Sequence, residues 1–144
     1  MPVRTRKPTT PSSRYTSVRD FSELSDKRPE KRLTETRSYR AGRSKGRISV
    51  RRKGGRHKRQ YRLVDFKRQN RGVPGKVVSI EYDPNRSADL ALVVFADGDK
   101  RYLLSPRGLR VGATVQSGPG APIELGNALP LGDLPLGIAI HNVE

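Results

Sequence analysis

The sequence has no cysteine, which excludes both a disulfide framework and a cysteine-based zinc site. Its two histidines, His57 and His141, have no neighbouring ligand residues at the spacing of a metal site, so we expect no metal and no cofactor. No apolar run approaches the roughly 20 residues that span a bilayer, and we expect no membrane partner. The N-terminus also lacks the apolar core of a secretory signal. These absences predict a cytoplasmic protein. An organelle is the alternative, because the residues before Asp20 resemble a transit peptide in their Arg, Ser and Thr content.

Residues that could carry out catalysis are equally scarce. The acidic residues occur singly in turns, and no arrangement of Ser, His and Asp is suggested by their positions. The phosphate-binding pattern Gly-x4-Gly-Lys-Ser/Thr is absent. Catalysis requires a nucleophile or an acid–base pair in a concave, partly dry pocket. We therefore predict that the protein is not an enzyme and has neither catalytic residues nor a small-molecule substrate.

Positive charge is what the sequence has in excess. The formal net charge is +16 at pH 7, far more than solubility requires, which points to a polyanionic partner. Residues 1–71 contain 24 Lys and Arg against 6 Asp and Glu, whereas residues 72–144 contain 6 against 8. Apolar residues are distributed the other way, with 15 in the first segment and 32 in the second. We expect a basic arm attached to a globular domain, because only the second segment has enough apolar side chains to form a core.

The most basic stretch is Arg43–Arg59, which has nine Lys or Arg, three glycines and no acid. Ile48 and Val50 alternate with polar residues, which predicts a short strand with one apolar and one cationic face. Gly54-Gly55 lets the backbone turn freely and lie close to a partner. Such a surface suits a polyanion with regularly spaced phosphates, and RNA is the partner that we predict. The expected RNA-binding residues are Arg43, Lys45, Arg47, Arg51, Arg52, Lys53, Gly54, Gly55, Arg56, His57, Lys58, Arg59, Arg62, Lys67, Arg68, Arg71 and Arg86.

Strand signals are frequent after residue 75, where short apolar runs are separated by turn residues. One alternating run places Val78, Ile80 and Tyr82 on the same face. Leu90–Ala96 is apolar on both faces and predicts a central strand, and Asp97-Gly98 predicts the hairpin turn that follows it. The expected strands are 76–82, 90–96, 100–104, 114–116, 123–125 and 138–143, with 61–66 as an edge strand and with 127–136 irregular but packed.

Five or six short strands at roughly ten-residue spacing, with no long helix, favour a small antiparallel barrel. We predict a mainly β protein, in which a small antiparallel oligonucleotide-binding (OB-fold) barrel is preceded by a long basic N-terminal extension. An SH3-like barrel would give the same pattern. We expect residues 1–42 to be an extended arm that is disordered until bound. Residues 43–71 are the expected RNA-binding segment that leads into the barrel, and residues 72–144 are the barrel.

Four motifs in this chain are long enough to be specific. They are Gly54-Gly55-Arg56-His57-Lys58-Arg59 with Tyr61-Arg62 and Asp65-Phe66-Lys67-Arg68; Ile80-Glu81-Tyr82-Asp83-Pro84-Asn85-Arg86-Ser87-Ala88; Asp97-Gly98-Asp99-Lys100-Arg101-Tyr102; and Gly126-Asn127-Ala128-Leu129-Pro130-Leu131. In this order they resemble the second protein of the large ribosomal subunit, in its bacterial and organellar branch. The likeness runs almost continuously from Arg40 to Glu144. It implies a ribosomal protein that binds large-subunit rRNA directly, early in assembly, with neighbouring ribosomal components as further partners.

The resemblance also implies a domain order: an OB-fold barrel, then an SH3-like barrel, then a long basic tail. This sequence matches only the N-terminal half, because it ends at Glu144, where the family's first barrel is followed by the second. The other half holds a histidine-containing loop near the peptidyl-transferase region, and neither His57 nor His141 has a matching context. An isolated domain, a separate polypeptide that carries the C-terminal half, and an incomplete sequence stay open as explanations.

Two binding functions remain to be separated. A structural protein of the large subunit would thread its arm among rRNA helices. A free single-stranded nucleic-acid chaperone would bind through the strands of its barrel, as cold-shock proteins do, and would need cations and aromatic residues there. Residues 72–144 have more acids than bases. The charge distribution therefore favours the ribosomal function, with the OB-fold chaperone as the alternative.

Overall fold

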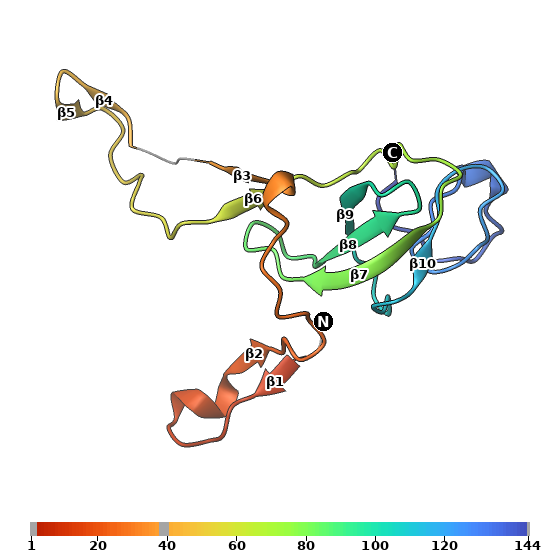
Figure 1. Ribbon diagram of the computed structural model, residues 1–144. Coiled ribbons are helices and arrows are strands. Elements are labelled where there is room, and N and C mark those ends of the chain that lie inside the picture. Colours follow the sequence, from red (N-terminus) through yellow and green to blue (C-terminus); the bar gives the residue numbers. More distant parts are fainter. Residues whose placement is uncertain (1–2, 38–40, 144) are drawn as a thin grey trace.

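A computed structural model of the chain describes residues 3–37 and 41–143 (Figure 1). Its centre is one antiparallel sheet with the strand order β10-β7-β8-β9. These strands are β7 (Gly75–Glu81), β8 (Leu90–Phe95), β9 (Lys100–Leu104) and β10 (Thr114–Val115). The sheet curls into a half-barrel, and no α-helix occurs in the described part of the chain. The protein is therefore mainly β with an architecture consistent with an OB-fold, as the sequence predicted.

Strand β8 is buried on both faces, which confirms the prediction of a central strand. Ala91, Val93 and Phe95 belong to the larger core cluster, while Leu90 and Leu92 on the other face belong to a smaller one. The larger cluster also contains Val77, Ile80, Leu103, Leu109 and Val115, and the smaller one is completed by Tyr102. A strand with core on both sides has no solvent face, so its sequence is a continuous apolar run.

Strand β7 departs from the simple alternation that its sequence suggested. A bulge between Val77 and Ser79 leaves Val78 without a partner on β8. Val77 pairs with Val93 and Ser79 with Leu92, which are consecutive residues of β8. The extra residue moves the following side chains to the opposite face. As a result Val77 and Ile80 both face the core, whereas Val78 and Tyr82 are 42% and 45% exposed. The prediction that Val78, Ile80 and Tyr82 share one face is therefore wrong.

The region after β10 contains fewer strands than predicted. Residues 123–125 form no strand but lie in turns, in which the N–H of Asn127 donates to the carbonyl of Glu124 at 3.2 Å. The single pairing nearby is a bridge between Ser117 and Ala128. Residues 138–143 also form no strand, and the irregular stretch before them contains one 3₁₀ turn, η3 (Leu131–Asp133). An apolar alternation makes a strand only where a neighbouring strand supplies hydrogen bonds, and no described strand runs alongside these residues. Leu131 and Leu136 are exposed, so the expected packing of 127–136 is wrong for them.

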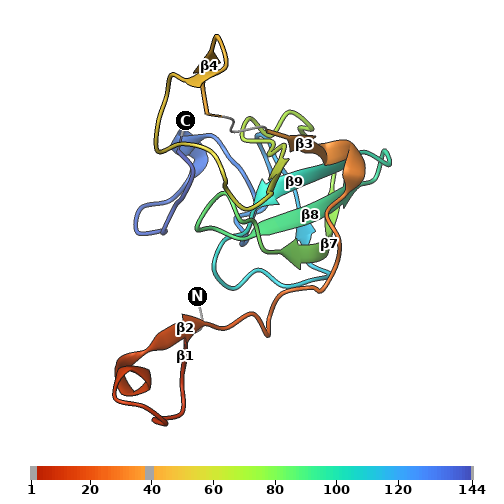
Figure 2. The ribbon, with the colours of Figure 1, turned by 90° about the vertical axis from the view of Figure 1, so that its left-hand side faces the viewer.

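The described residues before β7 form three small two-stranded sheets. The pairs are β1 (Val3–Thr5) with β2 (Ser17–Arg19), β3 (Thr34–Thr36) with β6 (Gln60–Arg62), and β4 (Arg43–Ser44) with β5 (Arg47–Ile48). Two 3₁₀ turns, η1 (Ser12–Tyr15) and η2 (Lys31–Leu33), lie between them. Figures 1 and 2 show the β1–β2 hairpin away from the central sheet. Residues 1–2 and 38–40 of the expected arm lie outside the described residues, as does Glu144.

The part of the arm that precedes β3 contacts the half-barrel. Leu24 packs against the larger core cluster, and the N–H of Ser25 donates to the carbonyl of Ile80 at 2.8 Å. Leu33 packs against the smaller cluster. Further along, Val64 forms a parallel bridge with Tyr102 of β9. The chain therefore contacts the half-barrel twice, before β3 and again after β6. The residues between these two contacts, which include Arg43–Arg59, are held at both ends.

Candidate nucleic-acid interface

The basic segment forms a projection that leaves the half-barrel and returns to it (Figure 1). Strands β4 and β5 make its tip, paired as Arg43 with Ile48 and Ser44 with Arg47. Every residue of Arg43–Arg59, here called the basic projection, is exposed. Its cations are therefore accessible to solvent, and no acid lies within the projection to neutralise them.

The alternation in the basic projection predicted a short strand with one apolar and one cationic face, but its apolar residues are open to solvent. Ile48 is 61% exposed and Val50 is 42% exposed. Strand β5 contains only two residues. It begins after the turn at Lys45-Gly46, where the φ angles are 46° and 74°, and it ends before Ser49, whose N–H donates to the carbonyl of Gly42 at 2.8 Å. The projection thus has no core of its own and presents backbone and cationic side chains on all sides.

Gly54 and Gly55 have φ angles of 101° and 63°, in the left-handed region that other residues rarely adopt. No atom lies within 4 Å of the position that a Cβ would occupy at Gly55. The pair is therefore required for its backbone conformation and leaves the main chain open on that side. This agrees with the prediction that the glycines let the backbone turn.

The base of the basic projection is fastened to the turn after β7. The guanidinium of Arg59 donates from Nη1 to the carbonyl of Pro84 at 2.8 Å. Asn85 donates from Nδ2 to the carbonyl of Gln60, also at 2.8 Å. Together with the pairing of β3 and β6, these hydrogen bonds fix where the projection leaves the half-barrel.

Two of the predicted RNA-binding cations point inward at this same turn. The buried Arg62 has Nε at 3.7 Å from Oε2 of Glu81 and Nη1 at 3.7 Å from Oδ1 of Asp83. Arg86 donates from Nε to Oδ2 of Asp83 at 2.7 Å. The carboxylate of Asp83 is fully buried and is neutralised by both cations. Arg62 and Arg86 therefore hold the base of the projection in place, and the structure separates them from its exposed cations.

Tyr102 completes this buried polar network. Its hydroxyl donates to Oε2 of Glu81 at 2.8 Å and accepts from the N–H of Glu30 at 2.9 Å. Burial, and then the hydrogen bond to the Glu81 carboxylate, raises the pKa of Tyr102 to about 12. The N–H of Glu30 acts in the opposite direction. Sequence reasoning missed this network. A signal was present, because the acidic Glu81 directly follows the apolar Ile80 at the end of β7 and is followed by Asp83 two residues later.

The cations that follow β6 are divided between solvent and protein. Lys67 and Arg71 are exposed. Arg68 is partly buried, its N–H donates to Oδ1 of Asp65 at 3.0 Å, and burial lowers the pKa of its guanidinium. His57 has Nδ1 at 3.1 Å from the carbonyl oxygen of Lys58 and lies among the exposed cations of the projection. Lys67 and Arg71 therefore extend the cationic surface toward the half-barrel.

The described residues offer neither a metal site nor a membrane-spanning helix. They contain no group of three or more His, Cys, Asp or Glu side chains that could hold a metal ion. None of the helices among these residues has the length and apolar character that crossing a membrane requires.

An OB-type half-barrel that carries an exposed, acid-free cationic projection defines a nucleic-acid-binding protein. Residues 30–117, more than half of the chain, match the family described as Ribosomal Proteins L2, RNA binding N-terminal domain. The chain belongs to this family. The resemblance inferred from four sequence motifs is thereby confirmed, and the chain is a ribosomal RNA-binding protein that contains the N-terminal domain of the family.

Proposed function

We propose that this protein is a structural constituent of the large ribosomal subunit that binds large-subunit rRNA directly and supports subunit assembly. The observation that carries the proposal is the basic projection, Arg43–Arg59, which is exposed throughout and contains nine cations without an acid. Phosphate contacts of this kind supply most of the affinity for a nucleic acid. The exposed cations Lys67 and Arg71 continue the same surface.

The geometry favours binding through the projection over binding through the barrel strands. The two predicted cations nearest the half-barrel, Arg62 and Arg86, are engaged with Glu81 and Asp83. Of the aromatic residues in the central sheet, Phe95 and Tyr102 are buried in the core. A chaperone of the cold-shock type needs these groups on its surface. We infer that the half-barrel serves as the support and the projection as the principal contact with RNA.

The partners that follow from this proposal are large-subunit rRNA and neighbouring ribosomal components, and the place of action is the ribosome. Its function is structural, and the two buried carboxylates at the base of the projection, Glu81 and Asp83, support this because they are ion-paired with arginine. Whether a second polypeptide carries the family's C-terminal half is a separate proposal, which the gene sequence downstream of Glu144 will test.

The salt dependence of binding tests the proposed function. We expect the affinity for large-subunit rRNA to fall steeply with salt, by roughly 10³–10⁵ between 50 and 200 mM if 6–10 phosphates are contacted. Replacing Arg51, Arg52 and Lys53 together with Ala should weaken binding and lower the salt slope by about 3, since each phosphate contact contributes about 1. Filter binding over a salt series measures both quantities.

A matched control removes the same charge from the barrel. Lys76, Arg107 and Arg110 are exposed cations on or beside the central sheet, and their joint replacement with Ala should leave the salt slope nearly unchanged. Equal losses in both triple variants would show that only net charge matters. A wild-type affinity that does not vary with salt would overturn the proposal.

A further inference from the structure

Two arginines and two aromatic rings alternate in space between Arg37 in the arm and Phe66, which follows β6. The guanidinium carbon of Arg37 lies 3.6 Å from the ring centroid of Tyr61. Arg86 lies 5.6 Å from the same ring and 6.0 Å from the ring of Phe66. The last ring in the series, Phe66, is 43% exposed. An aromatic ring that is open to solvent beside a cationic surface is the usual platform for an unstacked nucleobase.

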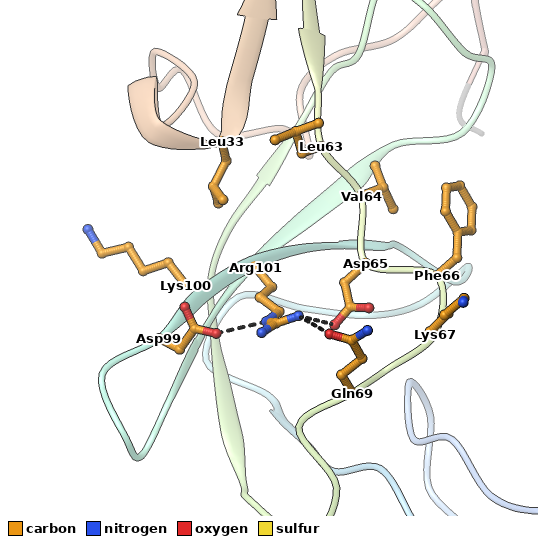
Figure 3. A pocket seen from close by; sticks show the side chains of 10 residues that line it. All are labelled: Leu33, Leu63, Val64, Asp65, Phe66, Lys67, Gln69, Asp99, Lys100 and Arg101. Carbon is orange, nitrogen blue, oxygen red and sulfur yellow. Dashed lines mark hydrogen bonds and ion pairs between the residues drawn. The ribbon is translucent and has the colours of Figure 1, made fainter.

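A hollow of about 530 Å³ lies beside this ring (Figure 3). Figure 3 shows Leu33, Leu63 and Val64 on one side of it, with Phe66 and Lys67 at its edge. Leu63 is 40% exposed, so the apolar side of the hollow is open to a ligand. The volume lies in the range of sites that take small organic groups.

The opposite side of the hollow is polar and held in a fixed arrangement. Arg101 donates from Nε to Oδ2 of Asp99 at 2.8 Å and from Nη1 to Oδ2 of Asp65 at 3.2 Å. The same Nη1 lies 3.5 Å from Oε1 of Gln69. Within the described residues the amide nitrogen of Gln69 has no hydrogen-bond partner, and Lys67 has no ion-pair partner. A nucleotide has complementary chemistry: apolar ring faces, polar ring edges and a phosphate.

We propose that this hollow binds a single unpaired RNA base, stacked on Phe66, with Gln69 at the base edge and Lys67 at the phosphate. The inference rests on the proposed function, because rRNA held by the basic projection supplies the base. It adds a different kind of contact, since the projection binds phosphates and the hollow binds an extruded base. Phe66 was not among the predicted RNA-binding residues. Within the motif Asp65-Phe66-Lys67-Arg68, only the two cations were predicted to contact RNA.

Photochemical cross-linking tests where the base lies. The full chain is bound to a large-subunit rRNA fragment that contains 4-thiouridine, irradiated and digested with trypsin. Cleavage after Arg62 and Lys67 releases the peptide Leu63–Lys67, which contains Phe66. We expect this peptide to carry a nucleotide adduct, identified by mass spectrometry. Adducts confined to peptides from the basic projection would overturn the proposal.

Substitution of the ring tests its contribution to affinity. Phe66→Ala should weaken binding by about 5- to 150-fold, the loss expected for one stacked base, without changing the salt slope, because no phosphate contact is removed. Phe66→Tyr should retain the affinity. Tyr82→Ala is the matched control, since this ring is 45% exposed, nearly as much as Phe66, and does not line the hollow. A melting temperature measured for each variant identifies any loss of fold, and Phe66→Leu replaces Phe66→Ala if the latter unfolds.

The outcomes separate this inference from the proposed function. Unchanged affinity in folded Phe66→Ala, with a loss in the Arg51, Arg52 and Lys53 variant, would overturn the base site and leave the rRNA-binding function intact. Absence of salt-dependent rRNA binding in the wild-type protein would remove both. A loss in Phe66→Ala equal to that in Tyr82→Ala would also contradict a specific site.

Discussion

Single charged residues in this protein act differently according to their partners. Arg62 is as cationic as the residues of the basic projection, but it is buried between Glu81 and Asp83. Removing one member of a buried ion pair leaves an uncompensated charge and costs about 3–5 kcal/mol. Arg62 therefore contributes to the position and stability of the segment, whereas exposed cations such as Arg51 contribute to binding and little to stability.

Tyr102 gives a pH-dependent prediction at the same scale. Its pKa is raised from 10.0 to about 12 in the folded protein, chiefly by burial. The folded state therefore holds the phenolic proton more tightly than the unfolded chain. The stability that this provides is complete below pH 10 and is lost as pH rises from 10 toward 12, by roughly 2–3 kcal/mol in total. Urea unfolding at a series of pH values from 8 to 11.5 measures the loss.

The Tyr102→Phe variant supplies the control for this measurement. It removes the titrating hydroxyl and its hydrogen bonds to Glu81 and Glu30, so it should be less stable than the wild type at pH 8. Above pH 10 the difference between the two proteins should shrink, because only the wild type loses the contribution of this proton. A difference that stays constant up to pH 11.5 would show that Tyr102 titrates normally.

At the scale of elements, the basic projection depends on backbone geometry as well as on charge. Gly55 has a φ of 63° and open space around its Cβ position, so a side chain there would be strained without any clash. Gly55→Val should weaken rRNA binding by about 5- to 150-fold, corresponding to roughly 1–3 kcal/mol of backbone strain. The free energy of unfolding should change by no more than about 0.5 kcal/mol, because the projection is exposed, can relax in the free protein and takes up the strained conformation only when RNA orders it.

Gly132→Val is the matched control for Gly55→Val. Gly132 also has open space around its Cβ position, but its φ lies outside the left-handed region. Binding by filter assay and stability by thermal melting should both be nearly unchanged in this variant. Equal and negligible effects of the two substitutions on binding would show that Gly54-Gly55 is only a flexible spacer.

The elements that sequence predicted correctly are those set by neighbouring residues. The apolar run of β8 and the Asp97-Gly98 turn are local patterns, and Gly98 has the positive φ of 85° that the turn requires. The bulge in β7 depends on pairing with β8, which no local pattern records. The failed strands at 123–125 and 138–143 have suitable residues but no paired neighbour in the described structure.

The RNA-binding site, like the fold, was predictable only where neighbouring residues in the sequence determine it. An acid-free run of cations is visible in the sequence, and the projection is exposed as expected. The sequence could not distinguish Arg62 and Arg86 from the exposed cations. Their carboxylate partners are Glu81, at the end of β7, and Asp83, in the turn after it, and both lie about 20 residues along the chain from Arg62. The hollow beside Phe66 is likewise assembled from segments before β3, after β6 and in β9.

At the scale of the whole molecule, charge and apolar surface are separated along the chain. The buried apolar side chains of the described structure all lie within residues 77–121, in the half-barrel, whereas the arm and the basic projection carry the excess of cations. Ordering a residue costs about 1–2 kcal/mol, and repulsion among unneutralised cations opposes compact structure. Phosphates remove that repulsion. We therefore propose that the arm and the projection become fully ordered only on RNA.

Limited proteolysis tests this division in the free protein. Trypsin should first cut at exposed sites in Arg4–Arg14 and within Arg43–Arg59, where few side chains contact the half-barrel. Cleavage at Lys31 and Arg32 should be slower, because Leu24 and Leu33 pack against the two core clusters and β3 pairs with β6. The final resistant fragment should begin between Arg59 and Gly75.

Large-subunit rRNA should protect Arg43–Arg59 most strongly, because this projection supplies the phosphate contacts. The protection is measured by mass spectrometry of the fragments over time, with an equal mass of small-subunit rRNA as the control for non-specific coating. Protection by both RNAs to the same extent would show that binding lacks the expected preference. Resistance to trypsin throughout Arg4–Arg37 without RNA would instead show that the arm is stably folded by its contacts with the half-barrel, and the two-part organisation would then be wrong.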